Sequence, residues 1–495
     1  MRERLTLPPA DEVVEYLFKP RALAFIERDF RLMMWVNQAH VLMLVRQGIL
    51  TRDVGHSLIH ALRELEQEGA EGLTLDPHLE DLYFNLEHAL IAKVGMDVGG
   101  RMHTGRSRND LGATMTRLAV REALVDFLGL QLGLRACLLE KAAEHTETVM
   151  PGYTHLQPAQ PTTFGHYLAS VALALERDAQ RLLDVYPRLN LNPLGACAFA
   201  GTGFPIDRAM TAQWLGFDGI VDSTLDAVAS RDYVSELLAA MAIMGVTLSR
   251  LAQDLYLWCS GEWGTVEVAD DVAMTSSIMP QKKNPITLEH IKAKTGHLLG
   301  AVVASLAAQK AVNFMHCSDM WEAVAPLWDA FAQAQGVLHL TRRTVLGLQV
   351  NQTLMLERAT QDFSTATELA DVLVREKDLP FRMAHGIVGS LVARVLQQGL
   401  PWRAVTSTMI DDCAREVIGH ALSLSDEQVD RALDPLRNLA GKHAAGSPSA
   451  PETQRLISRA RDQLARQQRT VEAWQARPQQ ARHALDRELA AQQLT

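Results

Sequence analysis

The chain is 495 residues long, with 47% hydrophobic and 21% charged residues. This composition is typical of globular proteins, and the length allows roughly two to four domains with sizeable cores. The net charge of −10 and the pI near 5.9 exclude the basic surface of a nucleic-acid-binding protein, so an anionic ligand needs a local positive site.

The spacing of the cysteines and the length of the apolar runs indicate the cellular compartment of the protein. The five cysteines are scattered and form no CxxC pair, which favours a reducing cytosol over a disulfide framework or a zinc site. The stretch from Met1 to Pro9 has no apolar signal core, and no run reaches the ~18 apolar residues of a membrane span. We therefore expect a soluble, cytoplasmic protein with no membrane or nucleic-acid partner.

Residues 1 to about 100 show helical apolar spacing interrupted by short turns. A helix is predicted to begin near Glu80 and to end at the glycines between 95 and 100. The next stretch, 102–110 (MHTGRSRND), gathers two arginines, two hydroxyls, a histidine and an amide. Arginine binds both oxygens of a carboxylate through its planar guanidinium, so the cluster suits an anionic ligand. Taken alone, it is more typical of a charged turn in which Asn109 or Asp110 caps the next helix.

A helical pattern from Leu111 to about Glu147 is broken by residues 151–161 (PGYTHLQPAQP), which hold three prolines and a glycine. Within this stretch His155 can exchange protons near neutral pH, and Thr154 and Gln157 are polar neighbours that could orient it. A lone histidine beside a turn is more often structural, and both interpretations stay open at this point.

Long helices are expected at the centre of the chain. After a connection rich in glycine and proline (192–208), apolar residues recur at alternating steps of four and three from Leu237 to Trp258. Such a seam is typical of long helices packed at shallow angles in a bundle. Because strands alternating with turns do not recur, the sequence predicts an all-α fold.

The stretch 275–285 (TSSIMPQKKNP) is predicted to be an irregular loop between helices, because each proline costs about 3 kcal/mol inside a helix. Its hydroxyls and backbone N–H groups, with Lys282, Lys283 and Asn284, could hold an oxyanion. The alternative is a solvated loop with a lysine pair. A helix restarts near Leu288 and is predicted to run to about Val312.

Three helical domains are expected: an N-terminal domain (1–112), a central long-helix bundle that carries the 275–285 loop (113–361), and a C-terminal domain (362–495). The stretch 362–367 caps the entry to a smaller helical region, and 446–451 is a linker. The weakly amphipathic residues 452–494 are predicted to form a peripheral tail helix.

The order Ser-Ser-Ile-Met-Pro-Gln-Lys-Lys-Asn-Pro at 276–285 resembles the signature of the fumarase/aspartase superfamily, in the spelling of argininosuccinate lyases. The resemblance extends through 193–195, 204–208, 225–228 and 362–370, and covers most of the chain up to about residue 450. It implies the fumarase/aspartase-type fold and a homotetramer whose central bundle takes helices from all four subunits. Each active site would combine the three polar clusters of three different chains.

The resemblance also implies a reaction, the reversible anti-elimination of fumarate from a succinyl group. Ser277 is then the expected base, His155 a candidate acid or proton relay, and Lys282 the cation that stabilises negative charge. The substrate is a small dicarboxylate, and no metal or organic cofactor is implied. The substrate-binding residues expected are Ser107, Arg108, Asn109, Thr154, Gln157, Ser276, Met279, Asn284, His316 and Trp321.

The chain departs from argininosuccinate lyases at positions that serve the amino-acid end of argininosuccinate. Where those enzymes usually have Tyr-Asn-Lys-Asp-Leu-Gln, this chain has 316–321 (HCSDMW), and Val324 replaces a lysine. Leu111 stands where a glutamine is usual and Ile286 where an aspartate is usual. We therefore expect a carbon–nitrogen lyase that acts on a different N-substituted aspartate, such as an ethylenediamine-disuccinate-type substrate. The alternatives are an argininosuccinate lyase proper and, more remotely, a non-catalytic structural protein of the lens-crystallin kind.

Overall fold

The computed structural model of the protein describes residue 4 and residues 7–494. Residues 1–3 and 5–6, which make up part of the stretch without a signal core, lie outside the described residues.

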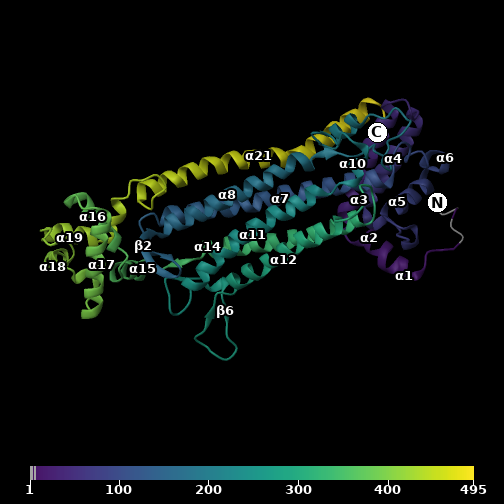
Figure 1. The fold of residues 1–495 in the computed structure, drawn as a ribbon. Helices are drawn as coiled ribbons and strands as arrows, with labels where there is room; N and C mark the ends of the chain where they lie inside the picture. The colour runs from purple at the N-terminus through teal and green to yellow at the C-terminus, as the bar shows by residue number, and fades with distance from the viewer. Residues whose placement is uncertain (1–3, 5–6, 495) are drawn as a thin grey trace.

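Five long helices lie side by side and form the centre of the molecule (Figure 1). The seam predicted between Leu237 and Trp258 lies on α11, and all seven of its residues are buried. Among the described residues α11 is the one helix long and apolar enough to cross a membrane, but 61% of its apolar window is buried, as expected of a core helix. The all-α prediction is confirmed. The bundle helices are α7 (Arg108–Glu144), α8 (Phe164–Leu189), α11 (Asp232–Trp258), α12 (Ile286–Gln309) and α14 (Ala325–Leu346).

The N-terminal region packs around α3, whose residues 32–45 are all buried. A helix buried on every side lies in the middle of a core, and α3 is surrounded by α4, α5, α7 and α9. The predicted helix near residue 80 is α5, which Asp81 caps at its start and Gly95, with φ of 77°, ends. The elements of this region are α1 (Asp11–Val13), the π-helical turn η1 (Val14–Phe18), α2 (Lys19–Leu23), α3 (Ile26–Arg46), α4 (Arg52–Glu68), η2 (Ala70–Gly72), η3 (Pro77–Leu79), α5 (Leu82–Val94) and α6 (Met96–Gly99).

The C-terminal region has a separate hydrophobic core made of residues between Leu369 and Leu433. Its Trp402 is buried, and its indole N–H donates to Thr365 Oγ1 at 2.9 Å, which anchors the entry to this region. The helices are α15 (Gln352–Gln361), α16 (Ala366–Lys377), α17 (Phe381–Gln398), η5 (Trp402–Ala404), α18 (Ser407–Ile418), α19 (Asp426–Leu433) and α20 (Pro435–Ala440).

The tail forms one helix of 42 residues, α21 (Ala450–Ala491), which runs back along α8 and α7 to the N-terminal region (Figure 1). Its N-terminal part, up to Val471, contributes Ile457, Leu464 and Val471 to the core of the bundle. Its second half contributes Leu485 and Leu489 to the N-terminal core. The tail is therefore peripheral in position, yet it completes two hydrophobic cores.

The described residues contain four short two-stranded sheets between the helices. The sequence did not predict the hairpin of β1 (Val149–Thr154) and β2 (Gln157–Thr163), because its three prolines argue against a sheet. Prolines are tolerated here because each strand of a two-stranded ribbon keeps one unpaired edge. The other elements between the long helices are β3 (Leu191–Asn192), α9 (Arg208–Trp214), β4 (Gly219–Ile220), α10 (Thr224–Ala229), β5 (Val266–Glu267), η4 (Asp270–Val272), β6 (Met274–Thr275), β7 (Lys283–Asn284), α13 (Asp319–Glu322) and β8 (Gln349–Val350).

Candidate active site

The first polar cluster forms the N-terminus of α7. Ser107 is the N-cap: its hydroxyl accepts the N–H of Asn109 at 3.3 Å, and its own N–H donates to Asp110 Oδ1 at 2.9 Å. The cap is therefore made by Ser107 with Asp110, and not by Asn109. The pattern Ser-x-x-Asp at 107–110 is a capping-box signal that could have been read from the sequence.

Asp110 fixes this turn to the 193–197 loop. The Asp110 side chain is fully buried, and its Oδ2 accepts the N–H groups of Gly195 at 2.8 Å and Cys197 at 2.9 Å. Burial raises the pKa of Asp110, while the N–H donors act in the opposite direction. The sequence indicated Asp110 only as a possible helix cap and not as a residue that supports the site.

The guanidinium of Arg108 is held before any substrate arrives. Its Nη1 donates to Glu80 at 3.1 Å and to Asp81 at 2.9 Å, and its Cζ lies 4.1 Å from the centre of the Phe84 ring. Because Nη1 alone donates to both carboxylates, the other N–H donors of the Arg108 guanidinium stay available for a ligand. Asn109 donates to the carbonyl of Ala198 at 3.2 Å, which leaves its amide oxygen as an acceptor.

The positive charge of the cluster belongs to its arginines. Burial, together with Arg106 and Arg108, lowers the pKa of His103 to about 3, so this imidazole is neutral at physiological pH. The Arg106 guanidinium is buried over the Tyr83 ring at 5.6 Å. Arg108 is the more exposed of the two and is the cation that a carboxylate can reach.

The segment that departs from the argininosuccinate lyase pattern lies beside this cluster in the same chain. Trp321, in α13, packs its indole against Gly112 of α7, one turn after Arg108. The His316 ring meets the Trp321 ring edge-on, with centroids 6.4 Å apart. Leu111 and Val324, in contrast, are buried, so they act beneath the surface and are not exposed to a ligand.

The second cluster forms the tip of the β1–β2 hairpin. His155 and Leu156 make a two-residue turn with φ of 54° and 59°, a conformation that side chains other than glycine rarely adopt. Such strain is often retained where it positions functional groups. Thr154, His155 and Gln157 are exposed at this tip, while Tyr153 packs on Trp263 with ring centroids 4.7 Å apart. The hairpin is thus anchored at its base and presents its polar residues outward.

The third cluster is a loop that projects from the side of the bundle (Figure 1). The short strands β6 and β7 pair Met274 with Asn284 and Thr275 with Lys283, and α12 begins directly after Pro285. Between the strands, Ser276 Oγ accepts the N–H groups of Ile278 at 3.3 Å and Met279 at 3.1 Å. Ser277 is exposed and forms no hydrogen bond within the described part of the chain.

The two adjacent lysines of this loop differ in their environment. Lys283 Nζ pairs with Glu267 at 2.7 Å and with Asp270 at 2.8 Å, and hydrogen bonds to these two carboxylates raise its pKa. Lys282 is exposed and has no ion-pair partner among residues 7–494. The free cation is therefore Lys282, the lysine that the sequence analysis selected.

One chain does not bring the three clusters together. The 37 residues of α7 span about 55 Å, with the first cluster at its start and the hairpin five residues after its end. The signature loop leaves the side of the bundle between these ends (Figure 1). The structure brings the first cluster to His316 and Trp321, and it leaves the hairpin and the loop apart from them.

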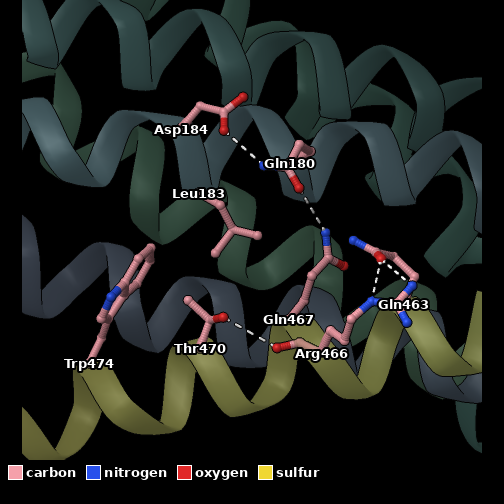
Figure 2. Close-up of a pocket in the computed structure, with 8 residues that line it drawn as sticks. All are labelled: Gln180, Leu183, Asp184, Gln463, Arg466, Gln467, Thr470 and Trp474. Atoms are coloured by element: carbon pink, nitrogen blue, oxygen red, sulfur yellow. Dashed lines mark hydrogen bonds between the residues drawn. The ribbon is translucent and has the colours of Figure 1, made fainter.

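A cavity of about 280 Å³ lies between α8 and α21, and none of its lining residues belongs to the three clusters (Figure 2). Its polar side chains bind each other: Gln180 donates to Asp184 at 2.8 Å, and Gln467 donates to Gln180 at 3.4 Å. Trp474, at one end, stacks on Tyr186 with centroids 3.6 Å apart. Because these groups are mutually satisfied, we do not place the active site in this cavity.

Comparison with known proteins gives matches along most of the chain. A family profile described as "Lyase" matches residues 25–300, and one described as "Argininosuccinate lyase C-terminal" matches residues 363–440. Argininosuccinate lyase 1 of Shouchella clausii is 42% identical over 93% of this chain and 93% of its own length. Argininosuccinate lyase of Methanothermobacter thermautotrophicus is 41% identical over 92% of this chain and 96% of its own. The solved structure of EDDS lyase in complex with formate is similar with a TM-score of 0.87 at 32% identity, over 99% of this chain and 96% of that one.

Proposed function

We propose that this chain, which belongs to the argininosuccinate lyase family of the fumarase/aspartase superfamily, releases fumarate from an N-substituted aspartate other than argininosuccinate. The observation that carries the proposal is the contrast between two groups of residues. The residues expected to handle the dicarboxylate are present in all three clusters, while His316 and Trp321 stand at positions that, by the resemblance, would serve the amino-acid end of argininosuccinate. The similarity to EDDS lyase supports an ethylenediamine-disuccinate-type substrate as one member of this class.

The proposed elimination breaks one C–H and one C–N bond. Ser277 Oγ, ionised to its alkoxide, takes the proton from the carbon beside a carboxylate and becomes a hydroxyl. The electron pair of the C–H bond forms the double bond of fumarate, and the amine nitrogen leaves with its bonding electrons. His155 supplies the proton that the leaving nitrogen needs. Lys282 and Asn284 stabilise the charge that develops on the carboxylate, and Ser276 and Met279 bind the substrate beside them.

The first cluster holds the succinyl carboxylates in this proposal. Ser107, Arg108 and Asn109 provide a hydroxyl, a guanidinium and an amide within one helical turn, and Arg108 keeps donors free of Glu80 and Asp81. Thr154 and Gln157 complete the pocket from the hairpin tip.

The site is proposed to form between three subunits of a homotetramer. The length of α7 keeps the first cluster and the hairpin of one chain about 55 Å apart, so they can meet only if different copies supply them. The outer faces of two bundle helices are apolar and open, which supports packing against another copy. The exposed residues on these faces are Ile243 and Val246 on α11 and Leu299, Val303 and Leu306 on α12.

Argininosuccinate lyase proper is the second candidate. The 42% identity to the Shouchella clausii enzyme over nearly the whole chain favours it. It requires that the altered segment at 316–321 still binds the arginine group.

Fumarate formation, followed by ultraviolet absorbance, tests the proposal. Argininosuccinate and a panel of N-substituted aspartates are supplied in parallel to the wild type and to Ser277→Ala. We expect fumarate from other N-substituted aspartates with higher kcat/KM than from argininosuccinate, and none from the variant. Equal or better cleavage of argininosuccinate would favour the second candidate. A folded protein that cleaves no substrate in the panel would instead point to a structural role.

A further inference from the structure

The indole of Trp321 occupies a space that only a glycine at position 112 leaves open. A Cβ added at Gly112 would lie 2.7 Å from Cη2 and 3.0 Å from Cζ2 of Trp321. Non-bonded carbon atoms are in favourable contact at about 3.5–4.0 Å, so any side chain at residue 112 displaces the indole. We call Gly112 the seat of the Trp321 ring, because the ring fills the space that a side chain at residue 112 would occupy.

This seat lies on the part of α7 that carries the first cluster. Gly112 follows Arg108 by four residues and Asn109 by three, and residues at these spacings share one face of a helix. The Trp321 ring thus borders the position where Arg108 would hold a carboxylate. We call Gly112, His316 and Trp321 the aromatic wall.

The chemistry of the aromatic wall does not suit a charged amino-acid group. An indole offers one N–H donor, no acceptor and no formal charge, and the His316 imidazole adds no carboxylate, so the wall has no anion for an ammonium group. A group with both an ammonium and a carboxylate needs partners for both charges when it is desolvated. Phe314 and Met315, in the same segment, are exposed and add apolar surface. Asp319 and Glu322, both in α13, are the carboxylates nearest to Trp321 in the sequence.

We propose that Gly112 and Trp321 together determine which amine the enzyme accepts, and that the accepted amine has an uncharged apolar or aromatic substituent. This inference rests on the proposed function. Within that substrate class it favours an apolar amine over the charged amine of an ethylenediamine-disuccinate-type substrate. Gly112 acts through the Trp321 ring and is a positioning residue, while Trp321 contacts the amine side of the substrate.

The test compares Gly112→Ala with Gly133→Ala. Both substitutions lie on α7 and gain the same helix propensity, but nothing lies within 4 Å of a Cβ added at Gly133. The substrates are N-benzyl-aspartate and N-(2-aminoethyl)-aspartate, and succinate is used as a competitive inhibitor that reports on the dicarboxylate half. Thermal unfolding of each variant verifies that it is folded.

We expect the wild type to prefer N-benzyl-aspartate and Gly112→Ala to lower that preference about tenfold, with the inhibition constant of succinate unchanged. Gly133→Ala should keep the wild-type preference. In a Trp321→Ala background the alanine at position 112 should have no further effect, because the ring that it displaces is absent.

Three results would overturn the inference, and they are distinguishable. A wild type that prefers the aminoethyl substrate would contradict the apolar amine and point to the carboxylates of α13, Asp319 and Glu322. A Gly112→Ala variant with the same preference as Gly133→Ala would contradict the role of the seat. A wild type that cleaves neither substrate, nor any other N-substituted aspartate, would contradict the proposed function itself.

Discussion

The first cluster and the signature loop differ in how firmly the rest of the chain holds them. The first cluster is built into a helix start, with Asp110 buried beneath it and Arg108 tied to two carboxylates. The signature loop is fixed at its base by Lys283 and inside by the Ser276 turn, while Ile278 at its tip is 83% exposed. The first-cluster groups proposed to hold the succinyl carboxylates are thus preformed, whereas the proposed base and the loop residues proposed to bind beside it are on the segment that has room to move.

This difference suggests that the first cluster positions the substrate and that the signature loop brings the base to it. A rigid cluster can position a dicarboxylate without reorganisation, and a loop that closes over it can exclude water and bring the base to the reacting carbon. Substitutions in the rigid region should therefore change stability and activity together, whereas those in the loop should change activity alone.

The largest effect is expected for Ser277→Ala. Loss of the general base should lower kcat about 1,000-fold or more, and the unfolding temperature should stay unchanged because Ser277 is exposed and unbonded within the described chain. Steady-state fumarate release and thermal unfolding check both statements. Ser276→Ala, which removes the local turn and one proposed substrate contact but not the base, serves as the comparison and should lower kcat much less. A Ser277→Ala variant with a tenth of the wild-type rate would remove Ser277 from the proposed role.

The next effect is expected for Asp110→Ala. It leaves the buried N–H groups of Gly195 and Cys197 without their acceptor, so the free energy of unfolding should fall by about 3 kcal/mol, and KM should rise because the first cluster loses its support. Chemical denaturation measures the loss. Asp207→Ala, which removes a partly exposed cap of α9, should cost only about 1 kcal/mol. Equal losses in the two variants would show that the first cluster is no more rigid than an ordinary cap.

Substitution of the two adjacent lysines distinguishes substrate binding, proposed for Lys282, from anchoring of the loop by Lys283. Lys282→Ala should raise KM about tenfold or more, since a hydrogen bond to a charged group is worth about 1.5–3 kcal/mol. Lys283→Ala should have a smaller effect, because its partners Glu267 and Asp270 are exposed and such pairs contribute little. Steady-state kinetics on both variants checks the order, and the reverse order would exchange their roles.

The smallest effect is expected from pH at the base of the loop. The hydrogen bond and charge of Lys283 lower the pKa of Asp270, so this pair stabilises the folded loop above the ordinary Asp pKa near 4 and is lost as the pH falls through the lowered value. Hydrogen exchange of the Thr275 and Lys283 amides should therefore show less protection in acid. Asp270→Asn should abolish this part of the pH dependence, and an unchanged dependence in that variant would assign it to another group.

Local patterns were sufficient to predict the helices but not the contacts between them. The seam from Leu237 to Trp258 corresponds to α11, and the helix that restarts after Pro285 corresponds to α12. Both could be predicted because the spacing of apolar residues and the effect of a proline depend only on residues close in the sequence. The hairpin at 149–163 was missed because its prolines argue against strands, although Gly152 marks a place where a Cβ would lie 2.7 Å from the Gln160 carbonyl oxygen.

The candidate site shows the same limit. The residues of the three clusters were selected from the sequence, and their proposed roles stay predictions. The packing of Trp321 on Gly112 and the pairing of Arg108 with Glu80 join residues far apart in the chain. No local sequence pattern could therefore predict these two contacts. The burial of Leu111 and Val324 likewise depends on neighbours that only the folded chain supplies.

The course of α21 has a consequence for the order in which the protein matures on the ribosome. The N-terminal core, which contains Phe30 and Ala119, also contains Leu485 and Leu489, and Arg46 pairs with Glu488 at 3.4 Å. At about 5–20 residues per second, the ribosome makes Leu485 about 20 to 70 s after Ala119. During that interval the nascent N-terminal core lacks part of its cover, so its exposed apolar surface is a natural target for chaperones until the last helix docks.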